Sequence, residues 1–315
     1  MIRNYLFNAF PLCILQLEKE EIYSPFILRN YLQPVLIPQW KWFDYNSFEY
    51  SCSPFFTYNR LSADMVWANN INVLTFFMNA LNDGYYIDIA PDIYYTPGKW
   101  LYHKEHRFHL FIIYGYNSEK DCFLSLTYTD SWQYELLEIK SSILARTCST
   151  DYFEYVAILK RDKSNVIIYD IEELKYLFSQ YIISGKKHKD FFCRYRHRLE
   201  TKLYDIDVMD WMVEYVQTNK KHSTTMVYTF YEQKSFMSWA LEYVAKRENV
   251  MTSELQDKID FLKNESRVAL NLFLKYKITK SVIYKERTAN KFKKLNETEI
   301  KGIKLLLKSL RNIIS

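Results

Sequence analysis

Two apolar runs decide the fold, His109-Leu-Phe-Ile-Ile-Tyr-Gly-Tyr-Asn117 and Cys122-Phe-Leu-Ser-Leu-Thr-Tyr-Thr-Asp130, and a polar segment of four residues separates them. Both runs are rich in β-branched and aromatic side chains, which favour strands, and the polar segment is typical of a turn. The pattern therefore predicts an antiparallel hairpin. Because His109 opens the first strand and Asp130 ends the second, we expect the hairpin to place an imidazole beside a carboxylate, the arrangement that orients a general base.

Further segments with strand or helix patterns lie on both sides of this hairpin. An apolar helix is predicted at residues 66–81, and the other patterns predict strands at residues 85–90, 134–139, 152–160 and 166–169. We expect these strands to form an antiparallel sheet with a helix in front of it, which is an α+β arrangement. Residues 1–60 contain five of the seven prolines. They are therefore expected to be irregular, apart from short extended pieces such as residues 11–15.

The second half of the chain has a helical pattern and contains no proline. Asp170 is expected to cap a helix that ends at Ser184, with Glu173 completing a capping box. Further helices are predicted at residues 208–218, 232–247, 254–276 and 297–314. The sequence thus predicts two domains, an α+β domain at residues 1–165 and a helical region at residues 166–315 that packs on it.

The glycines and cysteines disfavour several classes of site. The five glycines form no GxGxxG, GxxxxGK[ST] or GxSxG motif, which disfavours dinucleotide, P-loop and α/β-hydrolase sites. The five cysteines are an odd number without a CxxC pair, a pattern that suits free thiols in the reducing cytoplasm better than a disulfide framework. No apolar run approaches the ~20 residues that a transmembrane helix needs, so we expect a cytoplasmic protein without a membrane partner.

The spacing of His103, His106 and His109 suits a zinc site only if all three lie on one helix. The segment instead leads into a predicted strand, on which His106 and His109 would point to opposite sides. We therefore expect no metal and no cofactor. For His109 and Asp130, the alternative to a catalytic pair is a polar residue at a strand edge and an aspartate that caps a turn.

Three stretches in this region together resemble a known family: residues 82–86 (NDGYY), residues 94–98 (YYTPG), and His109 followed by residues 112–116 (IIYGY). Shorter matches lie at residues 7–15, 31–33, 169–171 and 272–276. The family comprises papain-like cysteine-protease homologues from bacterial natural-product gene clusters. It is related to the N-terminal domain of butirosin biosynthesis protein H and to the amide synthetases of thiotemplated assembly. The resemblance implies a papain-like fold with a Cys-His-Asp site.

The resemblance also implies roles for particular residues. His109 falls on the family's histidine, and Asp130 lies within a residue of the family's aspartate. The family's cysteine falls on Leu6, which leaves Cys13 as the candidate nucleophile; the alternative for Cys13 is a small buried apolar residue. The implied function is a cysteine-protease-like acyltransferase or amide synthetase that acts on carrier-bound or peptide substrates in peptide natural-product biosynthesis. The alternative is a catalytically inactive member that binds a peptide or a carrier protein.

The C-terminal region carries a local excess of positive charge. Between Lys275 and Arg311 there are twelve lysines and arginines against three glutamates, which leaves the remainder of the chain net acidic. Helical spacing gathers part of this charge on one face, which we call the basic face: Lys291, Lys294, Lys301, Lys304 and Lys308. We expect the basic face to bind an acidic carrier protein, whereas the acidic remainder and the lack of a recognised module disfavour nucleic acid. The alternative is an ordinary solvated helix face.

Overall fold

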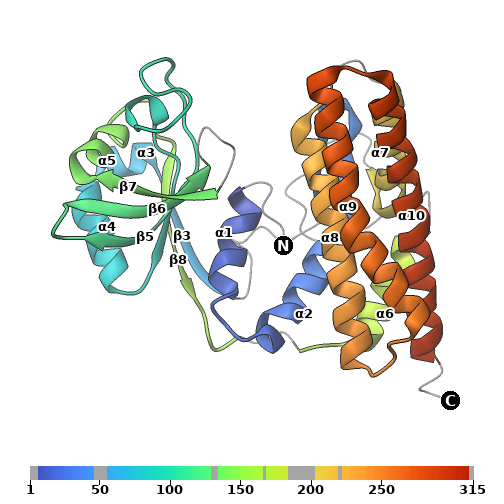
Figure 1. Ribbon diagram of the computed structural model, residues 1–315. Coiled ribbons are helices and arrows are strands. Elements are labelled where there is room, and N and C mark those ends of the chain that lie inside the picture. The colour runs from blue at the N-terminus through green and yellow to red at the C-terminus, as the bar shows by residue number, and fades with distance from the viewer. Residues whose placement is uncertain are drawn as a thin grey trace. The chain divides into compact units, whose positions relative to one another are not determined.

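The computed structural model describes residues 6–45, 55–128, 134–165, 168–183, 203–218 and 222–311. These residues form two compact units (Figure 1). The first, here called the sheet unit, takes the described residues within 5–17 and 50–166. The second, the helical unit, takes those within 18–49 and 167–315. The sequence predicted a single boundary at residue 165. The observed units differ from this division, because residues 18–49 belong to the helical unit.

The sheet unit is built on a six-stranded antiparallel sheet with the order β3-β8-β4-β5-β6-β7. Its strands are β3 (Phe56–Ser62), β4 (Tyr86–Ile89), β5 (Phe111–Asn117), β6 (Cys122–Tyr128), β7 (Tyr134–Lys140) and β8 (Tyr155–Arg161). The predicted hairpin is confirmed, because Asn117 pairs with Cys122 and the register continues to Ile112 opposite Leu126. The strands predicted near residues 85–90, 134–139 and 152–160 are also present. The α+β class is therefore confirmed.

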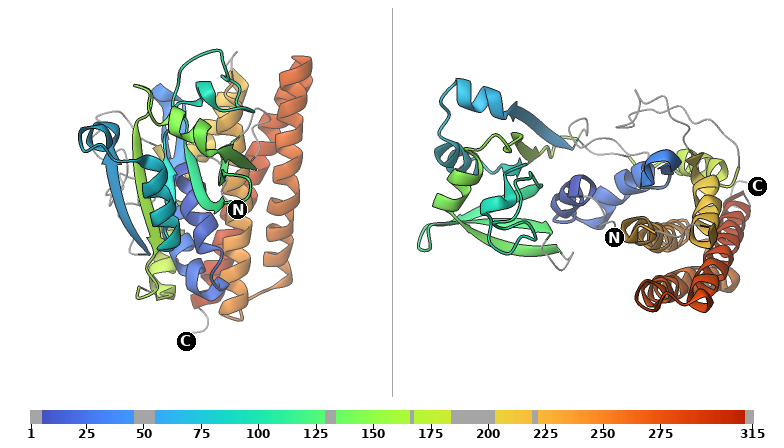
Figure 2. Two further views of the ribbon diagram at one scale, coloured as in Figure 1. Left: turned by 90° about the vertical axis from the view of Figure 1, so that its left-hand side faces the viewer. Right: turned by 90° about the horizontal axis from the view of Figure 1, so that it is seen from above.

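Side chains alternate between the two faces of this sheet, and one face forms the main hydrophobic core. Ile87, Ile113 and Ile158 share a cross-strand row on this closed face. The closed face is covered by α3 (Ala63–Ala68), α4 (Val73–Asn82) and α5 (Ser141–Thr147), whose apolar residues belong to the same core cluster. Figure 2 shows these helices on the side of the sheet opposite α1. The side chains buried on the closed face set the register of the strands, and the alternate side chains of each strand must therefore point to the other face.

The other face, which we call the open face, carries a row of facing residues from five strands. In register, Ala157 of β8 lies opposite Asp88 of β4, Asp88 opposite Ile112, Ile112 opposite Leu126, and Leu126 opposite Leu136 of β7. Helix α1 (Leu6–Leu15) lies on this side of the sheet (Figure 2). The row becomes steadily more exposed toward β7, where the Leu136 side chain is 72% exposed.

The predicted irregular N-terminal region is wrong in its main feature, because residues 11–15 belong to helix α1 rather than to a strand. Pro11 lies inside this helix, and Pro25 lies inside α2 (Glu20–Tyr31). A proline inside a helix costs about 3 kcal/mol through one lost hydrogen bond and a steric clash. Phe10 and Leu15 are buried, and burial of each such side chain contributes about 1.5–3 kcal/mol, which offsets the cost.

Two further predictions are corrected. The single helix predicted at residues 66–81 is two helices, α3 and α4, because Asn70 adopts a left-handed conformation at φ 50° and the Asn72 side chain caps α4 by accepting from the Thr75 N–H at 3.1 Å. The strand predicted at residues 166–169 is absent at Ile168 and Tyr169, while residues 166 and 167 lie outside the described residues. Asparagine tolerates both the left-handed conformation and the N-cap position, so local chemistry overrides the helical pattern.

The helical unit contains α2, α6 (Ile171–Tyr181), α7 (Asp205–Thr218), α8 (Thr224–Arg247), α9 (Ser253–Thr279) and α10 (Val282–Arg311). It also contains a 3₁₀ turn (Pro38–Trp40) and a three-stranded antiparallel sheet of β1 (Pro34–Ile37), β2 (Trp42–Tyr45) and β9 (Leu203–Tyr204). The predicted cap is confirmed, since Asp170 accepts from the Glu172 and Glu173 N–H groups. The Glu173 carboxylate pairs with Arg29 at 3.0 Å. Among the described helices, none has the length and apolar character that crossing a bilayer requires.

A fully buried ion pair lies inside the helical unit. Lys234 Nζ of α8 is 2.8 Å from Glu299 Oε2 of α10, and both side chains are completely inaccessible. The hydroxyl of Tyr181, on α6, donates a hydrogen bond to the other carboxylate oxygen of Glu299. Burial lowers the pKa of Lys234, although the carboxylate of Glu299 opposes this shift. The network joins three helices through polar groups that water cannot reach.

We predict that Lys234→Met destabilises the protein by about 3–5 kcal/mol, because it leaves the Glu299 carboxylate buried without its cation. The double variant Lys234→Met/Glu299→Gln removes both charges and keeps an acceptor for Tyr181, so it should recover most of that loss. Urea unfolding followed by circular dichroism measures both free energies. Equal destabilisation in the single and double variants would contradict the charge-burial explanation.

Candidate functional site

His109 lies just before β5, where its backbone N–H donates to the Pro91 carbonyl at 3.1 Å. Its ring meets the Trp100 ring edge-on, with the ring centres 4.8 Å apart. Burial, together with the charge of Lys99, lowers the pKa of His109 to about 4. Its Nδ1 atom is buried and has no hydrogen-bond partner among the described residues. The imidazole is therefore neutral at pH 7, but a pKa this far below neutrality makes it a weaker base than an ordinary histidine.

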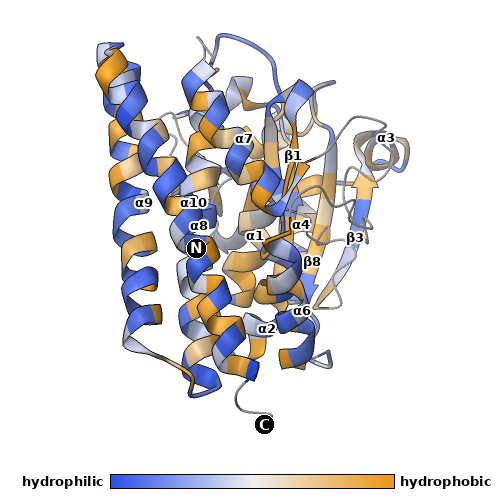
Figure 3. Ribbon diagram, turned by 90° about the vertical axis from the view of Figure 1, so that its right-hand side faces the viewer, coloured by the Kyte–Doolittle hydropathy of each residue, from blue (hydrophilic) through white to orange (hydrophobic). Residues whose placement is uncertain are grey.

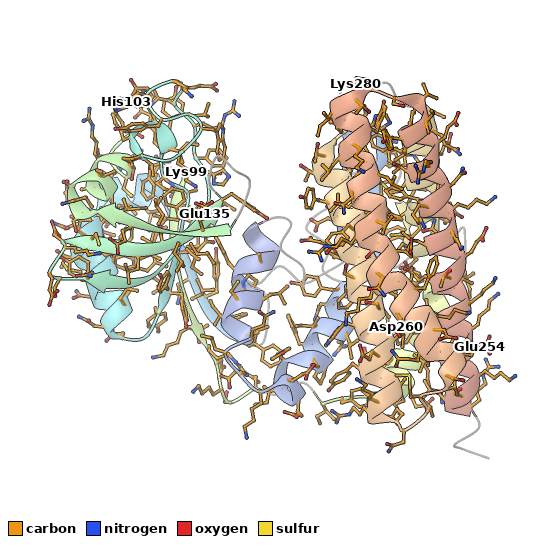
Figure 4. The ribbon with its side chains drawn as sticks, in the orientation of Figure 1. Lys99, His103, Glu135, Glu254, Asp260 and Lys280 are labelled. Atoms are coloured by element: carbon orange, nitrogen blue, oxygen red, sulfur yellow. The ribbon has the colours of Figure 1, made fainter. Side chains whose placement is uncertain are left out.

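Lys99 is a buried cation beside this histidine that the sequence analysis did not single out. Its side chain is 2% exposed, and Nζ donates to Thr127 Oγ1 at 2.7 Å and to the Tyr128 carbonyl. The ammonium group also lies 4.6 Å from the centre of the Phe111 ring. Figure 4 labels Lys99 within the sheet unit. A lone lysine after a Pro-Gly turn gives no sequence signal of burial, because burial depends on residues 28 and 29 positions away.

Asp130 lies outside the described residues, so its pairing with His109 remains a prediction. Cys52 and Cys193 lie outside them as well. Cys122 and Cys148 are buried, and burial raises the pKa of the Cys148 thiol to about 12. Neither buried cysteine has the exposure of a nucleophile. Among the described cysteines, Cys13 is the exposed one.

Cys13 is the third residue from the end of α1, and the described part of this helix begins at Leu6. A catalytic thiol gains acidity at the N-terminus of a helix, where the helix dipole is positive. The C-terminal end has the opposite sign and disfavours a thiolate. The family resemblance assigns the cysteine to position 6, near the N-terminal end of α1, where the helix dipole would favour a thiolate. In this chain that position is Leu6.

An apolar groove of about 290 Å³ separates α1 from the open face of the sheet. Helix α1 contributes Phe10, Cys13 and Ile14, the turn after it contributes Leu17, and the sheet contributes Tyr86, Ile112, Tyr114, Leu126 and Leu136. The helix residues follow the spacing of a single helix face, and three of the sheet residues belong to the cross-strand row. The Leu17 and Leu136 side chains are 75% and 72% exposed. His109 is not among the residues that line this groove.

A second histidine forms an imidazole–carboxylate pair that was not predicted. His106 Nδ1 lies 2.6 Å from Asp92 Oδ2, and the Asp92 side chain is fully buried. Asp92 also accepts from the Tyr94 and Arg107 N–H groups and from the Thr150 hydroxyl. The histidine spacing singled out His106 in the sequence. Its partner Asp92 could not be predicted in the same way, because it lies fourteen residues upstream and no short motif links the two.

The His106 ring is held in a stack of aromatic rings. It lies between Tyr94 and Tyr152, at centre-to-centre distances of 4.1 and 5.0 Å. His103, labelled in Figure 4, stacks on Tyr102 at 4.1 Å. Of the three histidines considered for zinc, His103 and His106 both contact the Tyr94 ring, whereas the ring of His109 packs against Trp100. This stack fixes the orientation of the His106 imidazole.

Comparison with known proteins gives no relative from which a site could be transferred. No protein-family model matches the chain, and no curated protein matches it. The candidate residues therefore rest on their own geometry and on the family resemblance in the sequence.

We predict that His109 makes the protein less stable as pH falls from about 6.5 to about 4. The folded state holds the imidazole neutral with a pKa of about 4, whereas the unfolded chain takes up a proton near pH 6.5. At pH 5 the loss relative to pH 7 is about 2 kcal/mol. Urea unfolding at both pH values should show a smaller difference for His109→Gln than for the wild type. An identical pH dependence in the two proteins would contradict this assignment.

Proposed function

We propose that the sheet unit is a papain-like module that binds an apolar acyl or peptide segment in the groove between α1 and the open face, without cysteine catalysis. The observation that carries this proposal is the position of the exposed thiol. Cys13 lies near the C-terminal end of α1, and Leu6 stands at its beginning. A nucleophile placed in this way has no help from the helix dipole, whereas the groove beside it is open to a ligand.

The composition of the groove supports an apolar ligand. Apart from the Cys13 thiol and two tyrosines, its lining is aliphatic or phenyl side chains. Ligand sites are typically apolar concavities of this size, and exposed apolar residues that cluster mark an interaction surface. A strand-like peptide or an extended acyl chain fits such a groove, because the rows of side chains on the sheet run continuously from β4 to β7.

A second candidate function is favoured by one observation, the presence of an exposed thiol inside that groove. An acyltransferase or amide synthetase would use Cys13 to take an acyl group from a carrier-bound thioester and pass it to an amine. In this case the thiol adds to the thioester carbonyl and the carrier thiol leaves; the amine then displaces Cys13. The family resemblance would make His109 the base and the predicted Asp130 the orienting group, although His109 does not line the groove beside Cys13.

The basic face on α10 supports an acidic carrier protein as the partner in either case. Lys294, Lys301, Lys304 and Lys308 are exposed along the helix, whereas Lys291 forms an ion pair with Glu265. Residues seven positions apart lie on nearly the same side of a helix, so Lys294, Lys301 and Lys308 form one row. A row of cations speeds encounter with an acidic surface and loses strength with salt.

We predict that Cys13 reacts faster with N-alkylmaleimides as the alkyl chain lengthens, because the chain occupies the groove beside the thiol. Peptide mapping by mass spectrometry measures the rate at Cys13 separately from the other cysteines. Leu136→Asp should remove the dependence on chain length, while the rate with N-methylmaleimide stays within about twofold. A rate at Cys13 that is independent of chain length in the wild type would contradict apolar binding in the groove.

The same protein distinguishes the two candidate functions when it is incubated with an octanoyl thioester of N-acetylcysteamine. A binding module should show no acyl adduct by intact mass, and turnover of the thioester should not exceed that of Cys13→Ala. An octanoyl adduct that is absent from Cys13→Ala and is discharged by an added amine would instead establish the acyltransferase.

For the basic face, we predict that replacing Lys301, Lys304 and Lys308 by Glu weakens binding to a purified acidic acyl carrier protein by at least about tenfold at low salt. The parent protein should also bind more weakly as salt rises. The matched control changes Lys104, Lys120 and Lys163 to Glu, three exposed lysines of the sheet unit. Equal weakening in both triple variants would indicate a general charge effect and refute a specific face.

A further inference from the structure

The turn between α9 and α10 exposes three aliphatic side chains at one end of the helical unit. Ile278 is 82% exposed, Val282 63% and Ile283 65%. They lie within six consecutive residues, where Lys280 ends α9 in a left-handed conformation and α10 starts at Val282. Figure 3 shows hydrophobic residues at this end of the α9–α10 hairpin. We call these three residues the apolar tip.

Positive charge surrounds the apolar tip. Residues 275–287 contain five cationic residues and one acidic residue, a local net charge of +4: Lys275, Lys277, Lys280, Lys285 and Arg287 against Glu286. No acidic residue occurs in the sequence between Glu265 and Glu286. The acidic residues of α9 lie toward its other end; Figure 4 labels Lys280 at the tip, and Glu254 and Asp260 at and toward the opposite end. Helix α9 is therefore cationic at the tip and net acidic toward its start, whereas α10 is cationic along its length.

Few of these cations are engaged within the protein. Lys277 donates to the His222 carbonyl at 2.9 Å, and Lys275 lies 5.9 Å from the centre of the Tyr284 ring. Lys280 and Lys285 form no ion pair among the described residues. Long lysine side chains at a helix end can extend their ammonium groups sideways to meet phosphate while the apolar residues between them enter a hydrocarbon layer.

We propose that the apolar tip inserts into the surface of an anionic lipid bilayer, with the surrounding lysines on lipid phosphates. Two exposed isoleucines and a valine at a helical turn gain free energy by entering the boundary between headgroups and acyl chains. A positive rim adds attraction to anionic lipid. This is a surface contact rather than a span, so it is consistent with helices that cannot cross a bilayer.

The size of the tip favours a bilayer over a protein partner. A specific protein interface takes about 20–30 residues from each side, whereas the tip offers three apolar side chains on a single turn. A bilayer needs no complementary pocket, because its surface deforms around the inserted group. The apolar residues match the hydrocarbon layer of the bilayer, and the cationic rim matches its negatively charged phosphates.

The experiment is co-sedimentation of the full chain with vesicles of phosphatidylcholine alone and of phosphatidylcholine containing phosphatidylglycerol. Binding is expected to the anionic vesicles and to weaken as salt rises. Replacing Ile278, Val282 and Ile283 by Ser should reduce binding at least about tenfold. Ile168→Ser is the matched control, because Ile168 is 83% exposed elsewhere in the helical unit, and it should leave binding within about twofold.

A second measurement separates insertion from adsorption by charge alone. A polarity-sensitive dye on Val282→Cys should shift to the blue with anionic vesicles, whereas the same dye on Ile168→Cys should not. Absence of vesicle binding would overturn the proposal, as would full binding by the triple Ser variant. If the triple Ser variant instead changes only the sedimentation mass in the absence of lipid, the tip is a contact between two copies and the proposal is wrong.

Discussion

The antiparallel pairing of β4 with strands on both sides is the constraint on which the sheet unit depends. β4 lies between β8 and β5, so its alternate side chains must serve two different environments. Ile87 and Ile89 enter the hydrophobic core beneath α4, while Tyr86 and Asp88 face the opposite side. A slip of one residue would exchange these sets and place a carboxylate in the core. The closed face and the groove beside α1 are thus two consequences of one register.

Each unit also buries charge, and the two do so in different ways. In the sheet unit, Lys99 is satisfied by a hydroxyl and a backbone carbonyl, and Asp92 by two N–H groups, a hydroxyl and His106. In the helical unit, Lys234 and Glu299 neutralise each other. Buried charges of this kind contribute little net stability, but removing one partner is costly. They therefore hold loops and helices in a single arrangement rather than adding to the total free energy of folding.

Sequence patterns correctly predicted those elements that depend on residues close together in the chain. The hairpin at Asn117–Cys122 and the cap at Asp170 both depend on residues a few positions apart, and both are present. The helices around Pro11 and Pro25 were missed because proline disfavours a helix locally, whereas the burial that compensates for it comes from distant parts of the chain. The membership of residues 18–49 in the helical unit likewise depends on long-range packing.

The sequence by itself determined the α+β class, the hairpin that begins after His109, and the concentration of positive charge in α10. Only the tertiary structure decided that His109 is buried beside Lys99, that Asp92 pairs with His106, and that Cys13 lies in an apolar groove near the wrong end of a helix for a nucleophile. The physical reason is the range of the interactions. Strand preference, caps and charge are properties of neighbouring residues, whereas burial, electrostatic environment and the lining of a groove arise from residues that meet only after the sheet has formed.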